Sequence, residues 1–346
     1  MIDQAGGRHR RPDPLVDDGH HLDDAVALHE GLDPVAHLHR RRRFGGGTVH
    51  ADMAAPASGR RRRTGLVEPD GPEPDVHPSR VDVVHRASMS RRLLAAAATI
   101  MAMTFEDTLA RLAVRPDPLT DTDRRALFAM LDAEEAQAVR VRATPLSDAN
   151  AILALAQRAY GDLRGLVIGL PDDLLDRAPR AGEWPLRQTL QHVISGELGY
   201  HAAALYAIAR RDGEPVAFPQ DRRPSPDAER IARGSAGDLL GYLSEVRARS
   251  DRDLAGLDAK ALRRPSVYGG REIDVRYRLH RFGAHVVEHT IQCETTLEAL
   301  GFRAGDARRT VRRISAARGA HEHLSTPDAL ATLDAEHTTK AAAPIA

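Results

Sequence analysis

Apolar residues recur at intervals of three and four in four long stretches of the chain, about 146–171, 182–211, 235–257 and 275–300. This period is that of an amphipathic helix with one buried face, and no alternating Val/Ile-rich run indicates a strand. The inward-facing positions are predicted to be Ile152, Leu155, Ala159, Leu163 and Leu166 in the first stretch, Leu186, Thr189, Val193, Gly196 and Tyr200 in the second, and Leu239, Tyr242, Leu243, Val246 and Leu254 in the third. The pattern predicts an all-α fold built on a four-helix bundle.

Local signals mark where these helices begin and end. Ser147 and Asp148 can cap the first, Pro185 suits the first turn of the second, and Gly301 stops the fourth. Shorter flanking helices are expected within residues 103–145 and 302–346, the latter followed by a tail. The segments 213–234 and 263–274 are expected to be connections, and the first of them either covers one end of the bundle or only joins two helices.

Residues 1–102 show neither a helical nor a strand period and are rich in Arg, Pro, Gly and His. Such a segment cannot bury enough apolar surface to order itself, so we expect disorder. A second hypothesis is that it is a mis-assigned extension and that translation begins at Met101 or Met103. The Arg runs at 40–43 and 60–63 resemble nucleic-acid tails, and residues 89–103 resemble a signal peptide without a clear cleavage site, so neither interpretation is favoured.

Charge and cysteine content narrow the class of protein. The 49 basic and 49 acidic residues cancel, so no net field recruits nucleic acid or a membrane surface. Cys293 is the only cysteine, which excludes an intrachain disulfide and a zinc site built from cysteines. Together with the lack of a long apolar run, this predicts a cytoplasmic protein in a reducing compartment.

The fourth predicted helix carries His285 and His289, which lie four residues apart and therefore on one face, about 6 Å from each other. Such a pair can bind one metal ion, and His192 in the second helix is a candidate third ligand. His280 is about 140° round the helix from His285 and is excluded. Three imidazoles with an open position are typical of catalytic zinc, and nickel, iron or copper also accept them.

Structural interpretations compete with each of these assignments. A helical His pair can arise by chance, and His192 can be a hydrogen-bonded packing residue, as we expect for His201. Cys293 is expected to be a buried apolar residue and Trp184 a hydrophobic anchor at a helix start. We expect His321 and His323, in "ARGAHEHLST", to face solvent.

Two motifs together resemble one family. "EWPLRQTLQHV" (183–193) is similar to the second-helix pattern of the DinB-like superfamily, also called DinB/YfiT-like metalloenzymes, with Trp184, Arg187 and His192 at its characteristic positions. "HVVEHTIQ" (285–292) is similar to the fourth-helix pattern HxxxHxxQ of that superfamily. The resemblance covers residues 146–301, and Pro185 departs from the small polar residue that usually follows the Trp.

The resemblance implies an up-down-down-up four-helix bundle with a divalent metal held by His192, His285 and His289. Zinc is the first expectation, and nickel or iron are alternatives. Members include transferases and isomerases that use mycothiol, bacillithiol or glutathione, and the Arg-rich composition is compatible with a mycothiol-using bacterium. In that case Arg187 or arginines of the loops could bind an anionic thiol or a substrate carboxylate.

Two main classes of function stay open from the sequence, and a third, nucleic-acid binding through the Arg-rich residues 1–102, depends on that segment being translated. The first is a metal-dependent enzyme, a small-thiol S-transferase or isomerase acting on a small-molecule substrate. The second is a non-enzymatic binding or scaffold bundle with structural histidines. No membrane or nucleic-acid partner is expected, whereas the sequence leaves a homodimer open.

Overall fold

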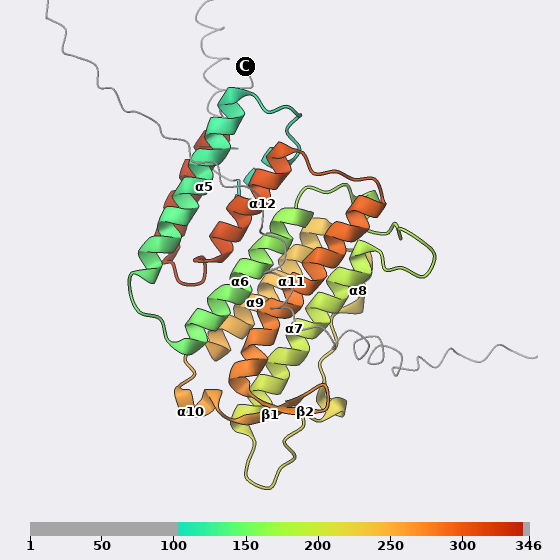
Figure 1. The fold of residues 1–346 in the computed structure, drawn as a ribbon, viewed down its shortest axis with the longest axis vertical. Helices are drawn as coiled ribbons and strands as arrows, with labels where there is room; N and C mark the ends of the chain where they lie inside the picture. The colour runs from blue at the N-terminus through green and yellow to red at the C-terminus, as the bar shows by residue number, and fades with distance from the viewer. Residues whose placement is uncertain (1–102, 342–346) are drawn as a thin grey trace, which may run out of the picture. The chain divides into compact units, whose positions relative to one another are not determined.

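The computed structural model describes residues 103–341, and the predictions for residues 1–102 and 342–346 lie outside this range. The described chain is almost entirely helical. Its longest helices are α5 (Asp121–Arg142), α6 (Asp148–Val167), α7 (Leu186–Ala209), α9 (Ala236–Leu254) and α11 (Val275–Ala299). Four of them, α6, α7, α9 and α11, form the predicted bundle (Figure 1).

Capping residues set the beginnings of these helices. Ser147 accepts a hydrogen bond from the amide of Asn150 at the start of α6, and Asp274 accepts one from Tyr277 at the start of α11. Ser235 and Asp238 form a reciprocal capping box before α9. Pro185 lies directly before the first residue of α7, so its missing amide hydrogen leaves no intrahelical bond unmade.

The bundle has the up-down-down-up order. Helix α6 packs against α11 and α9, and α7 packs against the same two, so the consecutive helices α6 and α7 are diagonal partners. The starts of α6 and α11 meet through an ion pair between Asp148 and Arg276, which makes these helices parallel. The start of α7 meets the residues just before α9, where Arg187 donates to the carbonyls of Ile231 and Gly234, so α7 and α9 are also parallel.

Parallel neighbours require a connection that returns along the whole length of α7. The 24 residues of α7 span about 36 Å, which explains why the segment between α7 and α9 is long. The segment is not purely a loop, because it contains the short helices η2 (Gln220–Arg222) and α8 (Ala228–Arg233).

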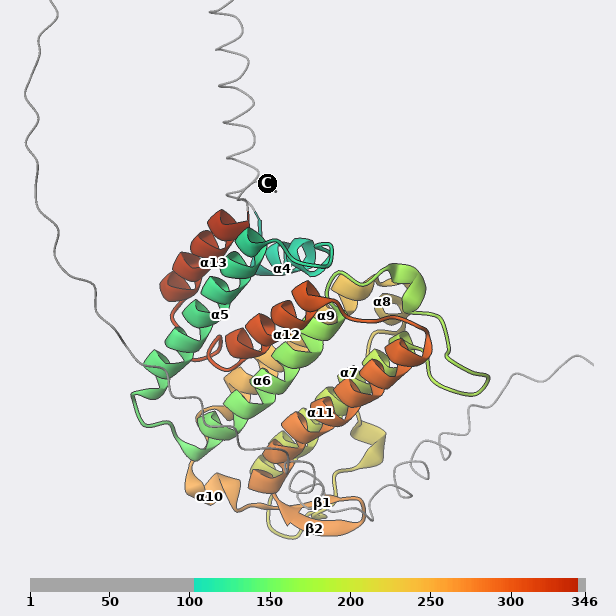
Figure 2. The ribbon, with the colours of Figure 1, turned by 45° about the horizontal axis from the view of Figure 1, so that its top comes forward.

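The flanking helices form a second layer on the outer side of α6. They are α4 (Phe105–Ala113), α5, α12 (Asp306–Gly319) and α13 (Pro327–Ala341), and α12 lies directly on α6 (Figures 1 and 2). Gly161 and Gly165 allow this approach, since a Cβ on Gly161 would lie 2.3 Å from the carbonyl oxygen of Ser315. One apolar core runs from the bundle into this layer.

Two expectations about local structure are wrong. Leu155 was placed in the inward stripe of α6, but its side chain is 56% exposed, because α11 and α12 cover the neighbouring faces and leave this one open. The connection at 263–274 contains the antiparallel hairpin β1 (Pro265–Tyr268) and β2 (Arg271–Asp274), beside α10 (Ala259–Leu262) at one end of the bundle. Gly269 and Gly270 both have positive φ, as a two-residue hairpin turn requires.

None of the described helices is both long enough and apolar enough to cross a bilayer.

Candidate metal centre

His192 lies in the second turn of α7 and is half-buried. The indole ring of Trp184, just before the helix, lies 5.4 Å from the imidazole ring, measured between centroids. The half-buried Trp184 therefore supports one side of the His192 ring.

His285 and His289 face α7 from α11. The His285 ring is buried and fills the space over Gly196, where an added Cβ would lie only 2.3 Å from Cε1 of the ring. Gly196 is four residues after His192 and shares its helix face. The glycine was predicted as a member of the packed stripe, but the sequence did not show that its missing side chain makes room for a histidine.

The three imidazoles converge. Nε2 of His285 lies 3.1 Å from Nε2 of His192 and 3.1 Å from Nε2 of His289. The potential ligand atoms of the three residues all lie within 4.8 Å of one another. Metal–nitrogen bonds of about 2.0–2.1 Å in a tetrahedral site place neighbouring nitrogens about 3.3 Å apart, so the donor set fits a single ion.

The environment keeps these imidazoles neutral. Burial, the charge of His289 and that of Arg223 lower the pKa of His192 to about 4. Burial and the neighbouring histidines lower the pKa of His285 well below its usual range, and burial also lowers that of His289. A neutral imidazole offers the lone pair that a metal requires.

Within the described residues, the cluster of potential metal ligands consists of the three histidines and includes no carboxylate. One hydrogen on Nε2 of His285 can be donated to only one of its two neighbours, so the rings cannot satisfy one another. An ion at their centre would engage all three lone pairs, which is the fit expected of a metal centre.

Gln292 fixes the orientation of the His289 ring. Its Oε1 lies 2.8 Å from Nδ1 of His289 and accepts the hydrogen of that nitrogen. With the hydrogen on Nδ1, the lone pair of Nε2 points toward the other two rings. Partners of this kind behind a ligand commonly set its tautomer and basicity.

Tyrosine, arginine and glutamate side chains surround the cluster. The Tyr200 ring lies 5.3 Å from that of His285, and its hydroxyl is 3.2 Å from the hydroxyl of Tyr268 on the hairpin. Arg281, one turn before His285, binds both carboxylate oxygens of Glu288 at 3.1 Å. The charge of Glu288 acts on both His192 and His289, and its carboxylate is already paired with Arg281.

Arg187 is occupied elsewhere. Its guanidinium binds both carboxylate oxygens of Asp176, at 2.6 and 2.9 Å, in addition to the two carbonyls before α9. Arg187 therefore holds the α7–α9 connection against the start of α7. Of the two predicted groups for binding an anion, Arg187 and the loop arginines, only the loop arginines stay available.

The other histidines and the cysteine lie outside the centre. His280 is exposed and lies outside the metal centre, and His201 is bonded to Asp253 at 2.9 Å as the packing residue that was expected. Cys293 is fully buried, which raises the pKa of its thiol to about 12 and makes it a packing residue. The expectation that His321 and His323 face solvent is wrong, because α13 and α5 cover the end of α12: His321 is fully buried, and both ring nitrogens of His323 are also buried.

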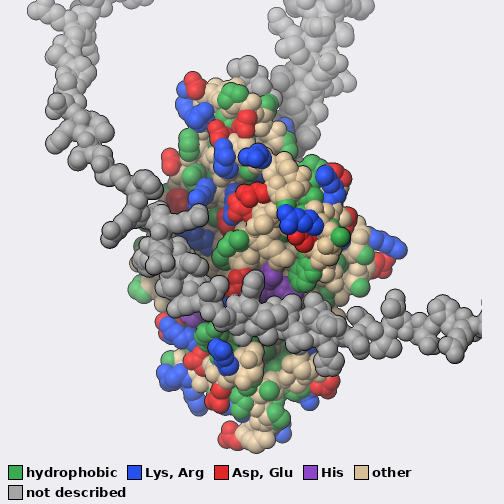
Figure 3. Space-filling model, turned by 45° about the vertical axis from the view of Figure 1, so that its right-hand side comes forward, with side chains coloured by type: hydrophobic (Ala, Val, Ile, Leu, Met, Phe, Trp, Pro, Cys, Tyr) green, Lys and Arg blue, Asp and Glu red, His purple; other side chains and the backbone are tan. Residues whose placement is uncertain are grey.

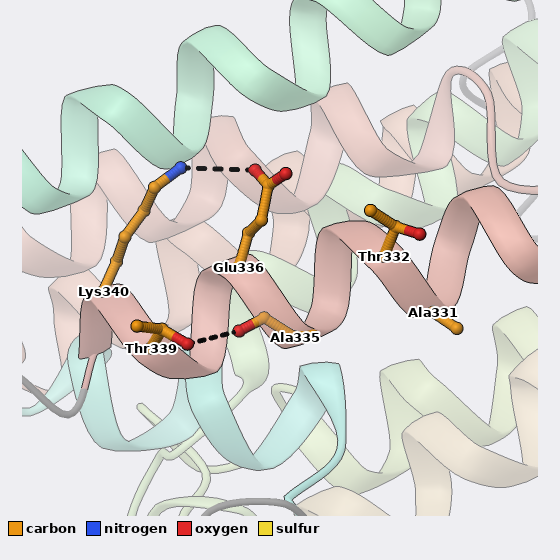
Figure 4. A pocket seen from close by; sticks show the side chains of 6 residues that line it. All are labelled: Ala331, Thr332, Ala335, Glu336, Thr339 and Lys340. Carbon is orange, nitrogen blue, oxygen red and sulfur yellow. Dashed lines mark hydrogen bonds and ion pairs between the residues drawn. The ribbon is translucent and has the colours of Figure 1, made fainter.

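One hollow of the described surface lies away from the histidines. It lies on the outer face of α13 between Ala331 and Lys340, and its lining residues all come from this one helix (Figure 4). Glu336 pairs with Lys340 there, and the Thr339 hydroxyl donates to the carbonyl of Ala335. These groups satisfy one another, so this is a solvated helix face. Histidine side chains are visible at the surface on the face drawn in Figure 3.

Comparison with known proteins gives two matches. Residues 155–293 match the family model described as the DinB superfamily, and this range includes His192, His285 and His289. Among solved structures, YfiT from Bacillus subtilis, described as a probable metal-dependent hydrolase with an unusual four-helix bundle topology, is similar at 16% identity and a TM-score of 0.37. That match covers 44% of this chain and 87% of YfiT. No curated protein sequence matches significantly.

Proposed function

Because the chain carries a DinB superfamily domain at residues 155–293, we propose that it is a metal-dependent enzyme that uses a small thiol as its nucleophile. The observation that carries this proposal is the convergence of three neutral imidazoles with no carboxylate between them. Structural histidines are normally paired with an acceptor, whereas within residues 103–341 the ring nitrogens of these three bond only to one another and to Gln292.

The proposed ligands are His192, His285 and His289, with zinc as the first expectation and nickel or iron as alternatives. When bound, the metal supplies Lewis acidity, which favours the thiolate form of a thiol at neutral pH. The residues of the chain orient the ligands: Gln292 holds the His289 ring, Trp184 supports His192, and Gly196 gives His285 its place.

The nucleophile must come from outside the chain if it is a thiol. Cys293 is the only cysteine, and it is fully buried with a raised pKa. Both oxygens of Glu288, whose charge acts on His192 and His289, are bound by Arg281, so this acid is not free to act as a base toward water. The reaction class that we propose is S-transfer or isomerisation in a reducing cytoplasm. The nucleophile would be mycothiol or another low-molecular-weight thiol.

Metal analysis of protein purified without a His tag tests the ligand set. We expect close to one divalent ion per chain in the wild type and its loss in His192→Ala, His285→Ala and His289→Ala. His280→Ala is the matched control, since His280 is an exposed histidine on the same helix and should not affect the metal. Equal metal content in all five proteins, or none after reconstitution of the wild type, would contradict the proposal.

A transfer assay separates an enzyme from a scaffold bundle with structural histidines. Monobromobimane serves as the electrophile: the thiolate sulfur attacks its methylene carbon, the carbon–bromine bond breaks, bromide leaves with the electron pair, and the thiol proton goes to buffer. We expect metal-loaded protein to accelerate the reaction and His285→Ala to return it to the uncatalysed rate. Identical rates for loaded and metal-free protein would favour the scaffold alternative.

A further inference from the structure

The connection between α7 and α9 runs back along α7 and passes the histidine cluster. Near the end of α7, the Tyr206 hydroxyl donates to the carbonyl of Pro215 at 2.7 Å and its ring packs 5.6 Å from Phe218. Near the start of α7, Arg187 holds the carbonyls of Ile231 and Gly234. The residues between these anchors must therefore lie beside the middle of α7, where the cluster is.

Arg223 comes from this part of the connection and packs on Gly199. A Cβ added to Gly199 would lie 3.4 Å from Nε and 3.7 Å from Nη2 of the Arg223 guanidinium. Positions 192, 196 and 199 lie on one face of α7, because they are four and three residues apart. His285 fills the space over Gly196, and Arg223 fills the space over Gly199, about 4.5 Å further along the helix.

The Arg223 side chain has no partner within the described chain. It makes no hydrogen bond or ion pair with residues 103–341, and it is exposed. The neighbouring arginines differ: Arg187 is bound to Asp176, and Arg281 is bound to Glu288. Arg223 is thus a cation at the edge of the cluster whose five N–H donors are free for a ligand.

The charge of the site favours an anion as that ligand. Three neutral imidazoles bring no negative charge to a divalent ion, and Glu288 is neutralised by Arg281. The exposed guanidinium of Arg223 lies against Gly199, one turn along α7 from Gly196 and the His285 ring, so its charge would repel a divalent ion held by the histidines. A ligand that brings negative charge both to the metal and to the Arg223 guanidinium would relieve the repulsion between these two cations.

We propose that Arg223 binds the carboxylate of a small molecule whose thiol sulfur occupies the metal centre. This inference rests on the proposed function, because it takes the three histidines to hold a metal. The ligand class is a mercaptocarboxylic acid or a larger thiol that carries a carboxylate a few bonds from its sulfur. A guanidinium binds a carboxylate through two parallel hydrogen bonds, so it selects charge and shape together.

A matched pair of thiols tests the assignment on cobalt-loaded protein. The probes are 3-mercaptopropionate and 3-mercapto-1-propanol, which have the same length and differ in the carboxylate. Binding is followed by the sulfur-to-cobalt charge-transfer absorption, which does not depend on turnover. We expect the wild type to bind the acid about tenfold more tightly than the alcohol, as a charged hydrogen bond at an exposed site implies.

Variants of the connection complete the test. Arg223→Ala should lose this preference and leave affinity for the alcohol unchanged, Arg223→Lys should keep part of it, and the adjacent exposed Arg222→Ala should behave as the wild type. An unchanged preference in Arg223→Ala, or none in the wild type, would overturn the Arg223 assignment alone. Failure of wild-type protein to bind cobalt would overturn the proposed function and this inference with it.

Discussion

Two clusters in this chain each bring buried or half-buried histidines together, and they differ in what lies at the centre. In the first, between α7 and α11, Nε2 atoms of His192, His285 and His289 face one another. In the second, between α5, α12 and α13, Nε2 of His321 and of His337 each face an oxygen of Glu134, at 2.5 and 2.6 Å. The comparison shows that the partner of a histidine, more than its burial, separates a structural role from a ligand role.

The cluster around Glu134 is a closed set of charges. Glu134 is fully buried, and Arg318 adds a third contact to its carboxylate at 3.2 Å. Burial alone would raise the pKa of Glu134, but the hydrogen bonds from His321 and His337 and the charge of Arg318 outweigh it and lower the pKa to about 2. The carboxylate therefore stays ionised and organises the flanking layer, whereas the cluster between α7 and α11 has no such counter-ion.

The largest effect is expected from Glu134→Gln, which removes the centre of the closed cluster. The change leaves Arg318 and two imidazoles facing a neutral amide, and breaking a buried ion pair in this way costs about 3–5 kcal/mol. Urea unfolding of the metal-free protein should show this loss in the free energy of unfolding. Metal content should not change, because Glu134 has no contact with the three-histidine cluster.

Glu135→Gln is the control for that variant. Glu135 is the next residue on α5, is exposed, and makes no ion pair with other described residues. The free energy of unfolding of the Glu135→Gln variant should therefore lie within about 0.5 kcal/mol of that of the wild type. Equal stability of the two variants would show that the Glu134 cluster does not support the fold.

Gly196→Ala should disrupt the three-histidine cluster without unfolding the chain. The added methyl group would meet the His285 ring at 2.3 Å, so the ring must leave its place. We expect metal affinity to fall about 100-fold, or about 2.7 kcal/mol. Stability should change little, since the clash is offset by the better helix propensity of Ala.

Gly241→Ala on α9 is the matched substitution for this test. A Cβ at Gly241 would have no atom within 4 Å, so only the propensity gain of up to about 1 kcal/mol is expected, with unchanged metal affinity. If Gly196→Ala bound metal as tightly as Gly241→Ala, the proposed position of His285 in the metal centre would be wrong.

The sequence predicted what local signals determine. Ser147 caps α6 as predicted, and the predicted stripes on α7 and α9 are buried except for Tyr200 and Tyr242, which are half-buried. His285 and His289 could be paired because they lie four apart on one helix. His192 was a candidate from its place beside the apolar stripe of α7, and the family resemblance strengthened the assignment, since nothing local places a residue of α7 opposite α11.

The sequence failed where the partner lies far away along the chain. His321 meets Glu134 across 187 residues, and no pattern near "AHEHLST" reveals that contact. Leu155 fitted a stripe of α6, but which face of α6 is covered depends on where α12 packs. The hairpin at 265–274 has strands of only four residues, too short for an alternating pattern to show. Arg223 could not be found from spacing, because its position depends on the parallel course of α7 and α9.

The smallest effect is expected from Gln292→Leu, which keeps the size of the side chain and removes the acceptor behind His289. The ring would then no longer be held with its hydrogen on Nδ1, and loss of such a partner typically weakens metal binding about tenfold. Gln292→Glu retains an oxygen acceptor and should keep metal affinity near that of the wild type. Competition with a chelator of known affinity measures both variants. Equal weakening in Leu and Glu variants would mean that packing of the side chain, and not its hydrogen bond, supports His289. The three-histidine cluster would then lack the ring orientation that distinguishes it from the closed cluster around Glu134.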